Sequence, residues 1–154
     1  MWNQILGAIS RDNFLKQLIY LGFIVFVLKV FALPFVQITD SDAVSRIFSA
    51  AEWAANPHLI VKGIWGPIHY YLLGTPLMLW NNAVYCPMLV TIIFSVAIIF
   101  PVYFFVKQGF SARSAFWVCA SLVFCTILFR NSFLPLSETP FLFFVACSLY
   151  DSEK

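Results

Sequence analysis

A long apolar run near the N-terminal end constrains this chain more than any other feature. Leu18 to Val36 carries a single charge, Lys29, and a helix of that length crosses a hydrocarbon core of about 30 Å. The rest of the chain is similar, because 62% of its 154 residues are hydrophobic and only 10% are charged. A surface this apolar is not soluble in water. The sequence predicts an integral, multi-pass membrane protein and excludes soluble enzymes and nucleic-acid binders.

Further apolar segments set the expected number of helices. Ala83 to Val106 is long enough to span, Ala115 to Phe129 follows it, and Pro140 to Tyr150 is about half a clear span. Ile68 to Trp80 is short and contains a proline, so we expect it to be interfacial or re-entrant. The predicted fold is an all-α polytopic transmembrane helix bundle. It has about four membrane helices and juxtamembrane helices, and residues 1–154 form a single membrane domain.

Residues 37–66 differ in composition and hold a large share of the charge in the chain. We interpret them as a first loop outside the membrane, on its exoplasmic face. Apolar residues recur there at i, i+3, i+4 and i+7, namely Val44, Ile47, Phe48 and Ala51. This spacing predicts an amphipathic helix on the bilayer surface, ended by Asn56-Pro57.

Basic residues indicate which side of the membrane each loop faces. They precede the first apolar run, and Lys107 and Arg113 flank the turn between the two later runs. The excess of Lys and Arg in cytoplasmic loops places the N-terminus and this turn inside. Residues 130–138 then share the exoplasmic side with residues 37–66. The membrane is a plasma membrane, a bacterial inner membrane or the endoplasmic reticulum.

Three carboxylates lie just outside the apolar runs: Asp40, Asp42 and Glu138. A carboxylate at the membrane boundary can act as a general base, bind a divalent cation beside a phosphate group, or do both. Asp40 or Asp42 could instead cap the surface helix. Glu138 stands among apolar residues, where a charge is costly without a partner, but it too could only cap the last helix.

Lys29 and Arg46 each allow two interpretations. Lys29 lies within a predicted span, so it must extend to the interface, pair, or face a cavity, and it could meet a lipid phosphate or a carboxylate from another chain. Arg46 could stabilise charge near the membrane surface, or it could pair with Asp42 one helical turn away.

Two segments resemble the first exoplasmic loop of the C-type glycosyltransferases. They are Ile38–Pro57, with its Asp-Ser-Asp sequence, and Trp65–Leu72, which reads Trp-Gly-Pro-Ile-His-Tyr-Tyr-Leu. Arg130–Pro140, with its Ser-Glu pair, is similar to the second acidic site of that superfamily. The superfamily includes the protein O-mannosyltransferases and related bacterial membrane transferases. The resemblance runs from about Leu18 to Tyr150.

The resemblance implies a transferase that moves a sugar from a polyprenyl-phosphate donor to a hydroxyl acceptor on the exoplasmic face. Asp42 or Asp40 matches the carboxylate that deprotonates the acceptor, and Glu138 matches the second acidic site. The donor's lipid phosphate leaves, so cations near the interface would stabilise it. Candidates in position are Arg130, His69 and Lys62. Asp40 and Asp42 could also hold Mg²⁺ or Mn²⁺, although two carboxylates do not complete a coordination shell.

The chain is shorter than such transferases, which have many more membrane helices. We therefore expect it to be an N-terminal portion, inactive when isolated, or to work with a second membrane polypeptide. Membrane lipids and the sugar donor are the other expected partners, and nucleic acid is not. Two rival functions stay open: a small non-enzymatic membrane subunit that docks a partner through its amphipathic helix, and a transporter fragment that uses Lys29 and Glu138.

Overall fold

The computed structural model describes residues 13–60 and 67–152, which are helical between short connections and contain no β-strand. An all-α fold is therefore confirmed for these residues. In chain order the helices are α2 (Asn13–Ala32), the 3₁₀ helix η1 (Leu33–Phe35), α3 (Ser41–Ala55), α4 (Pro67–Leu79), α5 (Tyr85–Ala97), α6 (Ile99–Gly109), α7 (Ala112–Phe124), α8 (Thr126–Asn131) and α9 (Glu138–Ser152).

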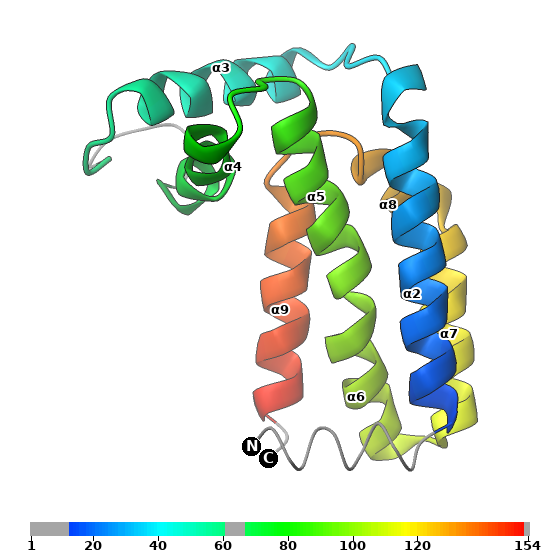
Figure 1. Ribbon diagram of the computed structural model, residues 1–154. Helices are drawn as coiled ribbons and strands as arrows, with labels where there is room; N and C mark the ends of the chain where they lie inside the picture. The colour runs from blue at the N-terminus through cyan, green and yellow to red at the C-terminus, as the bar shows by residue number, and fades with distance from the viewer. Residues whose placement is uncertain (1–12, 61–66, 153–154) are drawn as a thin grey trace.

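The helices form an upright bundle with a crosswise layer at one end. In Figure 1, α2, the α5–α6 rod, α7 and α9 stand side by side, while α3 lies across the end of the bundle with α4 beneath it. The chain alternates in direction, so the loop after α2 and the loop before α9 reach the same end. The turn between α6 and α7 lies at the opposite end.

Two of the rods are long and apolar enough to cross a membrane: Asn13–Phe35 and Tyr85–Gly109. They correspond to the first and second predicted spans. By contrast, α7 has 13 residues and α9 has 15, which at 1.5 Å per residue is about 20 Å each. The short segment α4 lies crosswise, as expected for a segment that does not span alone.

Two predicted helices are interrupted. The segment expected at 83–106 divides at Ile98 into α5 and α6. Pro101 has no amide hydrogen to donate to the carbonyl of Ala97, which explains this division. The segment expected at 115–129 divides at Cys125, where the backbone is extended with ψ at 117°. No proline lies at that second break, and its sequence gives no clear signal for it.

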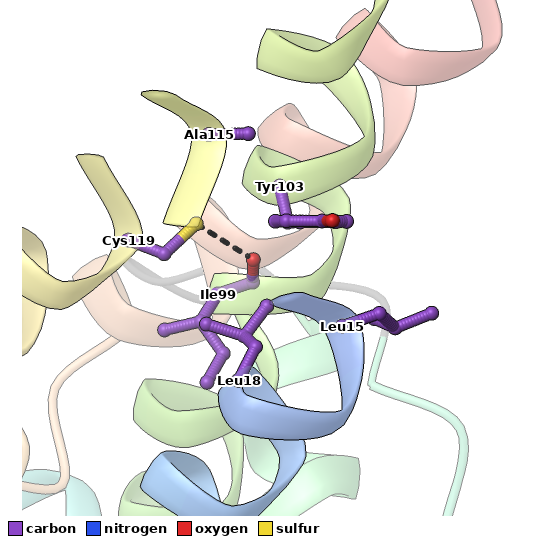
Figure 2. Close-up of a cluster of buried hydrophobic side chains, with 6 residues drawn as sticks. All are labelled: Leu15, Leu18, Ile99, Tyr103, Ala115 and Cys119. Carbon is purple, nitrogen blue, oxygen red and sulfur yellow. Dashed lines mark hydrogen bonds between the residues drawn. The ribbon is translucent and has the colours of Figure 1, made fainter. Parts of the chain in front are cut away.

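One core cluster joins α2, α6 and α7 at the end of the bundle opposite α3. Figure 2 shows Leu18 of α2 against Ile99 of α6, with Tyr103 of α6 and Cys119 of α7 in the same cluster. Each of these side chains is nearly inaccessible to solvent. The Cys119 thiol donates to the Ile99 carbonyl oxygen at 3.3 Å. Since these residues come from three different helices, their burial fixes the bundle's register.

The amphipathic helix exists as α3, but its buried stripe differs from the predicted one. The helix ends at Asn56, as expected, and Asp40 caps its start by accepting from the Ala43 amide at 3.0 Å. The residues turned inward are Ala43, Arg46, Ile47 and Ala50. Phe48, predicted to be on the apolar face, is 70% exposed. The stripe is shifted because small alanines allow α3 to pack closely on α4.

The crossing of α3 and α4 depends on Gly74. A Cβ atom at this position would overlap the Trp53 indole and lie 3.0 Å from the Ala50 carbonyl oxygen. The indole is held in place, because its Nε1 donates to the His58 carbonyl at 2.7 Å and its ring packs on Tyr71. The two helices therefore approach each other only where a side chain is missing.

We predict that Gly74→Ala lowers the stability of the protein by about 1–3 kcal/mol, since the added methyl must displace the indole or separate the helices. The measurement is the thermal unfolding midpoint in detergent micelles. Gly109→Ala is the matched control, because open space surrounds that position and alanine favours a helix. Equal midpoints for the two variants would contradict the close crossing.

Candidate functional site

The first loop and the segment before α9 meet at Arg46. Its Nη1 donates to the Ser137 hydroxyl oxygen at 2.5 Å and lies 3.8 Å from Oε2 of Glu138. Arg46 comes from the middle of α3, Glu138 is the first residue of α9, and Ser137 directly precedes that helix. This contact places α3 and the segment before α9 at the same end of the bundle; that both segments face the same side of a membrane stays a prediction. The sequence alone also allowed a pair between Arg46 and Asp42. The cluster is defined instead by the contacts of Arg46 with Ser137 and Glu138.

The two charges have different surroundings. The side chain of Arg46 is 6% exposed and that of Glu138 is 52% exposed. A buried guanidinium is costly without acceptors, so the Ser137 hydroxyl and the Glu138 carboxylate stabilise it where it lies. Glu138 also occupies the first turn of α9, where the helix dipole favours a negative charge. Arg46 thus orients the Glu138 carboxylate from one side, and the other side of the carboxylate is open to solvent.

His69 of α4 lies beside this pair. The residue is 6% exposed, and neither ring nitrogen makes a hydrogen bond to the described residues within ordinary geometry. The pKa of His69 is lowered to about 4, mainly by burial and also by the nearby Arg46 charge, while the Pro135 carbonyl and Glu138 act in the opposite direction. The ring is therefore neutral near pH 7 and can both donate and accept a hydrogen bond.

An apolar groove of about 360 Å³ opens at this cluster, between α4 and the first turns of α9. Its walls are Ile68, Leu72, Pro140, Phe141 and Phe144, and its polar lining comes from His69 and Ser137. Grooves with apolar walls and a few polar groups at one end suit an amphiphilic ligand. The ligand's polar group would meet His69 and Ser137, and its apolar part would follow the groove.

The two aspartates occupy the N-terminal end of α3, at the same end of the bundle. The carboxylate of Asp40 caps the helix, whereas Asp42 is exposed in the first turn. Within residues 13–60 and 67–152, no group of three or more His, Cys, Asp or Glu side chains could hold a metal ion. The described residues therefore do not form a complete shell for Mg²⁺ or Mn²⁺, and we assign no step to a metal.

The predicted cations do not all meet. His69 joins the cluster, but Arg130 lies exposed in the last turn of α8, next to Phe129. Lys62 lies outside the described residues. One member of the cluster, Ser137, was not among the predicted site residues. One sequence feature could have indicated the cluster. Arg46 stands at helical spacing from Ala43 and Ala50, so a charged residue lies on the same stripe of the helix as small apolar ones.

The lowered pKa of His69 predicts an acid-sensitive fold. Between pH 6.5 and about 4 the unfolded chain binds a proton that the folded chain does not, so stability falls as the pH is lowered through this range. We expect His69→Gln to reduce the slope of the melting temperature against pH by about 3 °C per unit. His58→Gln is the control, because His58 is exposed. Identical slopes for both variants would rule out a buried neutral His69.

No protein-family model, curated protein or solved structure matches this chain. The assignment of a function therefore rests on the described residues and their arrangement.

Proposed function

We propose that this chain is a multi-pass membrane protein and the N-terminal catalytic part of a C-type glycosyltransferase, which transfers a sugar from a polyprenyl-phosphate donor to a hydroxyl acceptor. The observation that carries the proposal is the contact of Arg46 with Ser137 and Glu138. It brings together the two acidic segments on which the resemblance to that superfamily depends. The apolar groove beside them has the character that a polyprenyl chain requires.

In the proposed reaction, Asp42 is the general base. Its exposed carboxylate takes the proton of the acceptor hydroxyl as the oxygen attacks the anomeric carbon of the donor sugar. The bond between that carbon and the phosphate oxygen breaks, and the polyprenyl phosphate leaves with the electron pair. Asp40 is the weaker candidate, because its carboxylate already accepts a hydrogen bond from the Ala43 amide.

Groups near the groove would stabilise the leaving phosphate. Neutral His69 can donate one hydrogen bond to a phosphate oxygen. Arg130 and Lys62 remain candidate cations from the resemblance alone, since Arg130 lies on α8 away from the cluster and Lys62 lies outside the described residues. Glu138 would orient the acceptor or sugar hydroxyls, since half of its side chain is open to solvent while Arg46 holds the other side. In this scheme Arg46 is a positioning residue.

A non-enzymatic membrane subunit is the second candidate function. The observation that favours it is Phe48, which lies on the outer face of α3 and is 70% exposed. Such a side chain would insert into the bilayer surface or into a partner. This function requires no carboxylate chemistry, so it predicts that substitution of Asp42 has little effect.

We predict that Asp42→Asn lowers transfer by a factor of about 10²–10⁴, the contribution typical of a general base. The assay follows loss of mannose from a polyprenyl-phosphate mannose donor, using the full-length protein in proteoliposomes. Glu52→Gln, an exposed carboxylate on the same helix, is the matched control and should keep full activity. Unchanged turnover in both Asp42→Asn and Asp40→Asn would leave the subunit as the better proposal.

The membrane topology makes a second prediction. Single cysteines replacing Ser41 and Arg130 in a cysteine-free background should react with a membrane-impermeant thiol reagent from one side of sealed vesicles. A cysteine replacing Ser111, in the turn at the other end of the bundle, should react only after the vesicles are opened. Reaction at all three positions in sealed vesicles would contradict a membrane-spanning bundle.

A further inference from the structure

Lys29 is buried inside the bundle, where α2 faces α5 and α8. The residue is 4% exposed, and its ammonium donates to the Ser95 hydroxyl oxygen at 3.1 Å. The ammonium also lies 5.5 Å from the centroid of the Phe129 ring. It makes no ion pair with a carboxylate of the described residues. A lysine ammonium has three N–H donors, so one hydroxyl and one aromatic face leave its charge largely uncompensated.

The inner side of Lys29 has little room. The enclosed cavity that it lines with Ser95 and Thr139 has a volume of about 20 Å³, which is enough for about one water molecule. Any larger anion must therefore approach Lys29 from its outer side.

The outer side opens into a groove of about 400 Å³ between α2 and the α7–α8 segment. Lys29 lines it together with Val25, Leu28, Val123, Phe124 and Phe129. Leu28, Phe124 and Phe129 are exposed at its rim, and Arg130, also exposed, follows Phe129 at the end of α8. The groove thus has apolar walls, with the Lys29 ammonium near the Phe129 ring and Arg130 directly after Phe129 in the sequence.

We propose that this groove binds an anionic glycerophospholipid, with its phosphate at Lys29 and Arg130 and an acyl chain along the apolar walls. Lys29 lies about 9 Å along the helix from the end of its apolar rod at Phe35, so a headgroup that enters the groove from that end has only about this distance to cover. Basic pockets between membrane helices bind anionic headgroups in this way. The proposal rests on the membrane location proposed above, but not on sugar transfer.

The test is lipid binding to the full chain in detergent micelles, measured by native mass spectrometry. The probes are dioleoyl phosphatidylglycerol and dioleoyl phosphatidylcholine, which share acyl chains and differ in net charge. We expect one phosphatidylglycerol to bind about tenfold more tightly than phosphatidylcholine, and Lys29→Met to remove that preference. Lys16→Met, the same change near the other end of α2, should retain it.

A second variant keeps the proposal falsifiable if Lys29→Met does not fold. Thr126 is exposed and lines the groove, so Thr126→Trp should fill the groove and release the lipid while Lys29 stays in place. Binding that is unchanged in Thr126→Trp, or a wild-type chain without preference for phosphatidylglycerol, would overturn the proposal.

Two competitors identify the anion. Displacement of phosphatidylglycerol by excess inorganic phosphate would overturn the assignment to a lipid, and tighter binding of a polyprenyl phosphate would make this a donor site instead. The assay uses micelles, so it gives its result whether or not the vesicle labelling supports a spanning bundle. A failure of the lipid site is thereby distinguishable from a failure of the proposed membrane location.

Discussion

The burial of Arg46 is the constraint on which the crosswise end of this molecule depends. A guanidinium in an apolar environment must be matched by acceptors, and Ser137 and Glu138, some ninety residues later in the chain, supply two of them. Satisfying this charge ties α3 to the start of α9 and so closes the surface layer over the bundle. The groove and the buried His69 lie beside that tie.

Local sequence patterns predicted where the helices lie in the chain better than they predicted which residues of different helices are in contact. The helix over residues 41–55, its cap and its end follow from Asp40, the helical spacing and Asn56-Pro57, because these signals act within a few residues. The same local signals did not predict which face of this helix is buried. Hydrophobicity alone favoured Phe48, whereas tertiary packing selected the small residues that fit against α4 at Gly74. Which face is buried depends on the shape of a partner helix.

For the candidate site too, the residues could be predicted from the sequence but the contacts between them could not. The carboxylates at the apolar boundaries could be found because charge is rare in this chain, and the positive-inside rule placed the two loops together. The contact between Arg46 and Glu138 could not be predicted, since Asp42 is a nearer partner by sequence spacing. The breaks at Ile98 and Cys125 show the same contrast: Pro101 accounts for the first, and no residue near Cys125 in the sequence signals the second.

The rods of the bundle differ in length, and this has a consequence for the surrounding lipid. The α5–α6 rod covers 25 residues, or about 37 Å, whereas α7 and α9 are each about 20 Å long. A bilayer in contact with such a bundle meets a hydrophobic thickness that changes around the circumference. Beside the short helices, the bilayer must become thinner, or another protein must take the place of the lipid. In the proposed membrane location, the hydrocarbon layer beside α7 would therefore be thinner than the layer beside the α5–α6 rod.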